Sequence, residues 1–558
     1  MKSASTSFLP IRRAALDPLT LDSRPSLAST VAFEEPTVEG APWIVTVEGV
    51  PTSRVSGAVV ELLSAMDGRS SVRDLRKEVA PDEPEPQFLT LVDRFQQSGL
   101  LEGTQRKSAG RVVFRAPLTL QIATLRAPAM FRRLDRIVRP FPGRAGLIVL
   151  AGLALLGSVA AIIQVSDVAR LLFSPMPLLQ LVVVLVVLVV LTLIHEGAHG
   201  LALTRFGGRP RRAGFMIFYL TPAFFVDVTD GWRLRHKWQR AWVALAGPAV
   251  HAVIGSAFAL AALLASATDL QQLLLLLAIA CYGIVLVNLV PFVRFDGYIA
   301  LMSALDEPNL RERTKRDGGN WLVHLLYGGS RAPKRLNRWW SVPFGIASIL
   351  APVCLVIFAV MRIAHALAGG GLVAGVVVLS LEVAVLILGL TAIAGGLRRA
   401  WRVGVSAWRF VLVNLVIAAT VALAGVWIVV PLTATAGFTV GEDNTVVIVQ
   451  GGSTEDPIPD GARLTLLTNG VMGSLPVGSS TYEARVPQSV NVPLDALFPV
   501  KMHDVDVPAT AIGVAHLGSD PGQVPSSGQA RMELGNVNLW QSLWNQAVAQ
   551  PLAGLLKR

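Results

Sequence analysis

The segment from Leu191 to Gly208, LTLIHEGAHGLALTRFGG, places three polar side chains close together in an apolar run. His195 and His199 are four residues apart, so on a helix both imidazoles project from one face about one turn apart. Two imidazoles so placed can hold one zinc ion, and Glu196 can act as general base toward the metal-bound water, as in the H-E-x-x-H motif. The alternative is a set of satisfied interior polar groups. Because an ionisable residue in a membrane helix is costly and by default marks function, we expect a hydrolytic Zn²⁺ site.

A third metal ligand must come from elsewhere in the chain. A catalytic zinc site usually takes three protein ligands and keeps the fourth position for water. The pattern of soluble proteases would need a histidine six residues after His199, but Arg205 stands there, and no glutamate occurs between Glu196 and Glu307. The remaining candidates are Asp227, Asp230, His236, His251, Asp269 and Asp296.

The composition of the chain indicates a membrane protein. Hydrophobic side chains make up 52% of the 558 residues, and the mean hydropathy is +0.54, which is typical of a membrane protein. The segment 214–226 is too short to span and contains Pro222, so we expect a re-entrant or hairpin segment at membrane depth. Seven apolar runs, each about 20 residues or longer, can cross a bilayer; they lie near 145–165, 178–204, 241–267, 270–293, 341–366, 371–396 and 410–435.

Basic residues orient these spans. The net charge is +11, and arginines and lysines cluster in every second connection, so the positive-inside rule predicts a cytoplasmic N-terminus and a C-terminus outside. No short apolar stretch near Met1 resembles a cleavable signal peptide. The charge is spread over short loops without an aromatic and basic face, which argues against nucleic-acid binding. Cys281 and Cys354 lie in apolar runs, which argues against a disulfide framework or a cysteine-based zinc site.

This topology narrows the choice of third ligand. The histidine pair lies in the inner half of the second span, whereas Asp269 falls in an outer turn. Asp296 lies at the inner end of the fourth span, at the same depth in the bilayer as the histidine pair. The fourth span also runs from outside to inside, as the second span does. Its neighbours Pro291 and Gly297 would break the helix and free the backbone to turn a carboxylate toward a metal. For Asp227 and Asp230, in FFVDVTDGW, we favour solvated carboxylates of a hairpin turn.

The two motifs together resemble the signature of the site-2 protease family of intramembrane zinc metalloproteases. The first is H-E-x-x-H, and the second is Asn288, Pro291 and Asp296-Gly297. ALAGPAVH at 244–251 is similar to the Ala-Gly-Pro stretch of that family, so the resemblance covers about 178–300. It implies that His195, His199 and Asp296 bind zinc, that Glu196 activates water, and that Asn288 positions or polarises the substrate carbonyl. At His251 many relatives have Asn, so this residue is either a ligand or its support, or a packed polar group.

The rest of the chain divides by composition. We predict a mainly α fold, a polytopic membrane helical bundle with a small N-terminal domain and a C-terminal β-rich domain. The C-terminal helix, which contains Trp540 and Trp544, would rest at the membrane interface or pack against the β-rich domain. The predicted parts are a flexible tail (1–38), a winged-helix-like domain of one strand and three helices (39–105), a linker and juxtamembrane segment (106–144), the transmembrane metalloprotease domain (145–435), an extracytoplasmic β-rich domain (436–536) and a C-terminal amphipathic helix (537–558).

The predicted N-terminal domain resembles the peptide-recognition element of enzymes that mature ribosomally made, modified peptides. That domain type binds a leader peptide as an added strand. Winged helices also bind DNA, but the acidic stretch EVAPDEPEPQ (78–87) argues against phosphate contacts.

The combination of both resemblances is similar to a bacterial subgroup of peptide zinc metalloproteases. It implies an endopeptidase of the bacterial cytoplasmic membrane that cleaves a precursor peptide, with a leader peptide, peptide-modifying enzymes or an exporter as partners. Two alternatives remain: an export or immunity protein that handles the peptide without cutting it, and regulated intramembrane proteolysis of a signalling protein. For the β-rich domain we expect either a cap over the exit route or a binding site for the released product.

Overall fold

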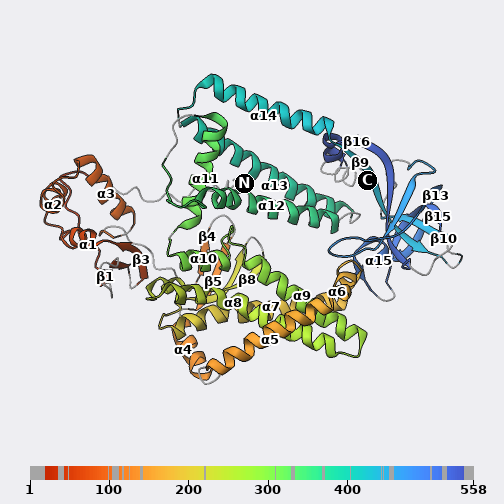
Figure 1. The fold of residues 1–558 in the computed structure, drawn as a ribbon, viewed down its shortest axis with the longest axis horizontal. Helices are drawn as coiled ribbons and strands as arrows, with labels where there is room; N and C mark the ends of the chain where they lie inside the picture. Colours follow the sequence, from red (N-terminus) through yellow and green to blue (C-terminus); the bar gives the residue numbers. More distant parts are fainter. Residues whose placement is uncertain are drawn as a thin grey trace, which may run out of the picture. The chain divides into compact units, whose positions relative to one another are not determined.

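The computed structural model forms two compact units, residues 1–142 with 192–247 and residues 143–191 with 248–558 (Figure 1). Each unit is described by itself. The structure describes residues 19–35, 43–47, 50–98, 100–102, 112–115, 119–124, 126–138, 143–218, 221–307, 309–328, 333–366, 371–402, 404–441, 443, 445–451, 458–502, 505–517, 524–545 and 549.

Seven helices among the described residues are long and apolar enough to cross a membrane, as the sequence predicts. Most of their large apolar side chains face outward, as expected for helices surrounded by lipid. The candidate spans are Ala145–Ile163, Leu178–Arg205, Lys237–Leu264, Thr268–Asn288, Ser341–Ala364, Gly375–Trp401 and Ala407–Trp427.

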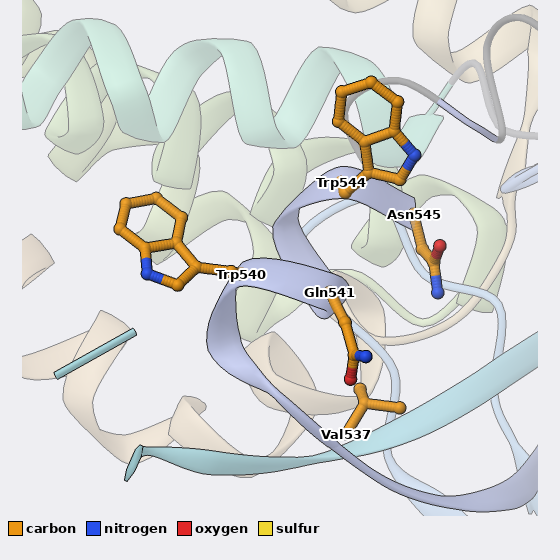
Figure 2. A pocket seen from close by; sticks show the side chains of 5 residues that line it. All are labelled: Val537, Trp540, Gln541, Trp544 and Asn545. Atoms are coloured by element: carbon orange, nitrogen blue, oxygen red, sulfur yellow. The ribbon is translucent and has the colours of Figure 1, made fainter. Parts of the chain in front are cut away.

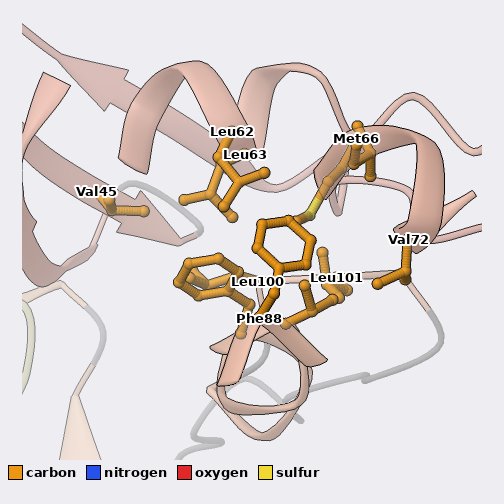
Figure 3. Close-up of a cluster of buried hydrophobic side chains, with 11 residues drawn as sticks. Val45, Leu62, Leu63, Met66, Val72, Phe88, Leu100 and Leu101 are labelled. Atoms are coloured by element: carbon orange, nitrogen blue, oxygen red, sulfur yellow. The ribbon is translucent and has the colours of Figure 1, made fainter. Parts of the chain in front are cut away.

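The N-terminal part of the first unit packs three helices around one apolar core (Figure 3). The helices are α1 (Gly57–Ser64), α2 (Val72–Val79) and α3 (Glu85–Gln97). Beside them lies an antiparallel sheet of β1 (Val31–Glu34), β2 (Trp43–Val47) and β3 (Val50–Val55), in that order. The sequence predicts the three helices and β2. It does not predict β1, which falls in the expected tail, or β3, because VPTSRV has no clear apolar alternation.

A capping box starts α2. The Ser71 side chain accepts a hydrogen bond from the backbone N–H of Asp74 at 3.2 Å, and its hydroxyl donates to the Asp74 carboxylate at 2.5 Å. The hydrogen bond from the Ser71 side chain holds the pKa of Asp74 below its usual range. The first turn of this short helix therefore keeps an ionised carboxylate, which the helix dipole favours.

A second sheet of the first unit has the order β4-β5-β7-β8. Strands β7 (Ala213–Phe218) and β8 (Thr221–Val226) form the hairpin predicted at 214–226. Strands β4 (Val112–Arg115) and β5 (Thr119–Thr124) come from the segment predicted as a linker, which also holds α4 (Ala127–Val138). Strand β5 pairs with β7 antiparallel across more than 80 residues of sequence, and such a pairing has no local signal.

The helices α7 (Leu178–Arg205) and α8 (Lys237–Leu264) have residues in both units. Small residues let α8 approach α5 in the second unit, since a Cβ at Gly157 would overlap the backbone of Ser256. The Gln164 side chain, which follows α5, donates to the backbone oxygen of Ala259 on α8 at 3.0 Å. The other helices of the second unit are α5 (Arg144–Ile163), α6 (Val165–Leu172), α9 (Thr268–Asn288), α10 (Asp296–Leu305), α11 (Leu310–Tyr327), α12 (Ser341–Ala366), α13 (Gly371–Arg402) and α14 (Ala407–Trp427).

The C-terminal domain confirms the β-rich prediction. Its antiparallel sheet has seven strands in the order β12-β11-β16-β9-β10-β15-β13 and packs around Phe438, Ile448, Leu464 and Met532. The strands and short helices are β9 (Val429–Val440), β10 (Thr445–Gln450), β11 (Arg463–Leu467), β12 (Pro476–Thr481), β13 (Glu483–Pro493), α15 (Leu494–Leu497), β14 (Val500–Lys501), β15 (Asp506–His516), β16 (Ser527–Asn538) and α16 (Leu539–Trp544).

The β domain is attached to several helix ends of its own unit. Strand β14 pairs with β6 (Met176–Pro177), which precedes α7. In the turn at 470–473, the Met472 backbone N–H donates to the oxygen of Leu172 at 3.1 Å, and the Arg362 side chain donates to the oxygen of Val471. These two hydrogen bonds join the domain to the ends of α6 and α12.

Replacing Gly470 by Ala is expected to destabilise this attachment. The added Cβ would overlap the backbone of Phe173, and overpacking of this kind costs about 1–3 kcal/mol. We expect a lower midpoint of thermal unfolding for the purified full chain in detergent. Gly478→Ala is the matched control, because a Cβ there meets its neighbours at 3.5 Å or more. Equal midpoints for the two variants would contradict the attachment.

Candidate metal centre

The two imidazoles of α7 turn their Nε2 atoms toward each other. The Nε2 atoms of His195 and His199 are 3.2 Å apart, and the ring planes are 82° apart. Both side chains are buried, with exposed fractions of 7% and 6%. Two nitrogens bound to one tetrahedral zinc at about 2.0–2.1 Å would lie about 3.3 Å apart. The pair therefore has the spacing of two ligands of one ion.

The backbone of α8 orients one of these rings. Nδ1 of His199 lies 2.7 Å from the backbone oxygen of Val243, which can only accept a hydrogen bond. The proton of a neutral His199 is therefore assigned to Nδ1, and Nε2 keeps the lone pair that a metal needs. This is the usual way in which an outer hydrogen bond fixes the tautomer of a ligating histidine.

Gly247 on α8 leaves space beside both rings. A Cβ atom at this position would lie 2.5 Å from Nε2 of His195 and 2.5 Å from Nε2 of His199. Any side chain here would therefore compete for the space in front of the two lone pairs. Gly247 belongs to the ALAGPAVH stretch, and its lack of a side chain serves the site.

Glu196 completes a group that could hold a metal ion. Its carboxylate and the ring nitrogens of His195 and His199 offer ligand atoms within 4.8 Å of one another. Its Oε2 accepts a hydrogen bond from the backbone N–H of Val226 at 3.0 Å. Val226 ends β8, an outer strand of its sheet, so the carboxylate is held at the edge of that sheet.

Further packing fixes the helix that carries the motif. A Cβ at Gly200 would lie 2.5 Å from the ring of Phe131, so α4 approaches α7 next to His199. Leu203 packs in a buried cluster with Leu234 and Val243. These contacts hold α7 against α4 and α8 in the turn that follows the histidine pair.

Asp296 and Asn288 lie in the second unit. Asp296 is the first residue of α10, and Asn288 is the last residue of α9. The Asn288 side-chain amide donates to the backbone oxygen of Ile284 at 3.0 Å. A Cβ at Gly297 would lie 2.6 Å from Cα and O of Leu289, so this glycine permits a close approach between the two helix ends. The helix break expected at Pro291 is present between α9 and α10. The role of Asp296 as third ligand stays a prediction.

Asp230 differs from the sequence expectation. It is buried in the 3₁₀ helix η1 (Thr229–Arg233), which follows β8, and it accepts a hydrogen bond from the backbone N–H of Arg209 at 2.8 Å. The Arg233 guanidinium lies 3.6 Å from its carboxylate. The expectation of a solvated turn carboxylate was therefore wrong, because the carboxylate balances a basic loop. Asp227 accepts a local hydrogen bond from the N–H of Thr229 at 3.1 Å.

The other candidates lie outside the histidine group. His251 is buried on α8, one turn beyond Gly247, and its role stays open. His236 is exposed just before α8, and Asp269 lies in the first turn of α9.

Sequence reasoning missed three contributors to the site: Val226, Val243 and Gly247. The first two act through the backbone, so their side chains carry no signal. Gly247 had a signal in the Gly-Pro pair of α8, but only the structure relates it to the rings.

The donor set limits the chemistry of the group. Two imidazoles with a nearby carboxylate suit zinc and other borderline divalent ions, and a carboxylate near a bound ion can also act as a base. No protein-family model, no curated protein and no solved structure matches the chain.

Proposed function

We propose that the protein is an integral membrane zinc endopeptidase. The observation that carries this proposal is the pair of Nε2 atoms 3.2 Å apart on α7, with Glu196 beside them. The group belongs to a candidate span, where ionisable side chains are costly unless they serve a function. Asp296 is proposed as the third ligand on the strength of its motif alone.

The chain's own residues divide the work of hydrolysis. A zinc ion at this site would supply a Lewis acid for the peptide carbonyl and lower the pKa of water. His195 and His199 would hold the ion, with the Val243 carbonyl fixing the tautomer of His199. Glu196 would accept the proton of the attacking water and pass it to the leaving amine. The Val226 N–H holds this carboxylate in place, and Asn288 would orient the substrate carbonyl.

The free edge of β8 offers a way to position an extended substrate. Among the strands that the structure describes, β8 pairs with β7 alone, and its last residue binds Glu196. A peptide that adds to this edge would run past the base in an extended form, which exposes its backbone carbonyls. The unpaired edge thus fits a protease better than a purely structural metal site.

The substrate class is proposed from the N-terminal domain. Its three-stranded sheet has β1 and β3 as outer strands, and β3 lies near η1, which follows β8 in the same unit. A leader peptide captured at such a sheet would be held close to the proposed site. We therefore propose a ribosomally made, modified precursor peptide as substrate, with cleavage on the cytoplasmic side and peptide-modifying enzymes or an exporter as partners.

Metal removal tests the reaction. Any short peptide encoded beside the gene is the first precursor to test, synthesised and mixed with the purified full chain in liposomes. We expect mass spectrometry to detect two fragments, 1,10-phenanthroline to abolish them, and added zinc to restore them. The restored activity separates metal dependence from unfolding by the chelator.

The same assay discriminates the alternatives. A peptide that binds but stays intact, with or without zinc, would contradict the protease and support the export or immunity function. Cleavage of a membrane-bound signalling protein, but of no precursor peptide, would support regulated intramembrane proteolysis.

A further inference from the structure

The C-terminal helix α16 lies against the last turn of a candidate span. The Trp540 indole N–H donates to the backbone oxygen of Ala422 on α14 at 3.0 Å. A Cβ at Gly425 would overlap the same indole, so the missing side chain allows the approach. The Leu539 backbone N–H also donates to the oxygen of Ile428 at 2.9 Å.

The short α16 is held by its own capping box. The Asn538 side chain accepts from the backbone N–H of Gln541 at 2.9 Å, and the Gln541 side chain accepts from the N–H of Asn538 at 3.4 Å. A helix of six residues gains little from its own hydrogen bonds, so the cap and the contact with α14 must fix it. The contact with α14 therefore sets the direction of the Trp540 indole.

Within the described residues, these contacts leave two large indoles mostly exposed. Trp427, at the end of α14, is 81% exposed, and Trp544, four residues after Trp540, is 64% exposed. Leu543, which directly precedes Trp544, is also exposed. An apolar surface of this kind is unfavourable in water. It continues the outward-facing side of α14, whose Val426 and Leu423 are also exposed.

The chemistry of this surface identifies what covers it. Tryptophan is enriched where a membrane meets water, because its ring is apolar and its N–H needs a polar partner. Residues 537–545, VNLWQSLWN, contain no charged side chain, so apolar contact with lipid is the main attraction that this stretch itself offers. The segment also carries the amides of Gln541 and Asn545, and the Gln541 side chain ends beside Val537 (Figure 2).

We propose that Trp427, Leu543 and Trp544 form an interfacial anchor that inserts into the bilayer where α14 ends. The ligand is the boundary between lipid headgroups and acyl chains, and the binding is apolar and independent of lipid charge. The anchor fixes the start of β9 and the end of β16, which pair as Val429 with Asn538. It therefore holds the β domain at a set height above the membrane. This inference does not depend on the proposed protease activity.

Lipid quenching of tryptophan fluorescence tests the anchor. The full chain is reconstituted into phosphatidylcholine vesicles with bromine either near the headgroup or near the chain end. The fluorescence emission of Trp427 or Trp544 is obtained by subtracting the emission of Trp427→Phe or Trp544→Phe from the emission of the wild type. We expect bromine near the headgroup to quench most of the emission of both tryptophans, and bromine near the chain end to quench less of it. The quenching should be the same in neutral and in anionic vesicles. Trp43→Phe, in β2 of the N-terminal domain, is the control and should leave the lipid-quenched emission unchanged.

Three outcomes would overturn the proposal. Aqueous iodide could quench the Trp544 contribution while bromolipids do not, which would place the indole in water. A second contrary result is that neither iodide nor bromolipid quenches the Trp544 emission, which would place a protein partner on the surface. A third contrary result is that bromolipids quench the emission only in anionic vesicles, which would make electrostatic attraction the cause of membrane binding. Glu196→Gln should give the wild-type quenching pattern, so loss of peptide cleavage and loss of the anchor are separate results.

Discussion

Replacing Glu196 by Gln is expected to lower the rate of precursor cleavage about 10²–10⁴-fold, the usual contribution of a general base. The amide oxygen of Gln can still accept the Val226 N–H, so the local geometry is retained, but the amide cannot take up a proton. His195 and His199 are unchanged, so zinc content should stay at the wild-type level. Single-turnover rates and metal analysis of the same sample measure the two effects.

A second glutamate within a candidate span provides the control. Glu382 lies in α13, outside the histidine group, and Glu382→Gln removes the same charge from a membrane helix. We expect this variant to cleave the peptide at the wild-type rate. Wild-type cleavage by Glu196→Gln would show that another group takes the proton.

Replacing Gly247 by Ala is expected to weaken zinc binding by at least the roughly 10–100-fold found when groups that orient metal ligands are lost. The new methyl group would lie 2.5 Å from both Nε2 atoms, so the rings must move apart or the methyl must occupy the space of the ion. Cleavage should fall in parallel, because the chemistry needs the ion. Competition with a chromophoric chelator measures the affinity.

The matched control for this substitution is Gly283→Ala. Gly283 lies on α9, in another candidate span, and a Cβ there meets nothing within 4 Å. Both variants add one methyl group to a membrane helix, but only one adds it in front of the imidazoles. Equal zinc affinity for Gly247→Ala and the wild type would mean that the ion is not bound between these rings.

The features that the sequence predicts correctly are the ones with a local signal. Seven apolar runs predict seven helices, because the bilayer thickness sets their length. The spacing of His195 and His199 predicts a shared face of one helix, because 3.6 residues make a turn. The hairpin at 214–226 follows from a run too short to span and interrupted at Pro222.

The missed features depend on contacts between distant segments. The pairing of β5 with β7 joins a supposed linker to the hairpin beside Glu196. Asp230 binds the backbone N–H of Arg209 and lies near the Arg211 guanidinium, and a local turn pattern contains no information about these two earlier residues. The hydrogen bond between His199 and Val243 comes from a backbone carbonyl, which is the same for every residue type.

The most direct test of the account is zinc K-edge X-ray absorption on the purified full chain. The account predicts about one zinc per chain with nitrogen and oxygen ligands at about 2.0–2.1 Å, no sulfur, and the multiple-scattering signal of two imidazoles. Protein without zinc, or bound zinc whose spectrum shows no imidazole, would contradict the assignment of His195 and His199 as its ligands.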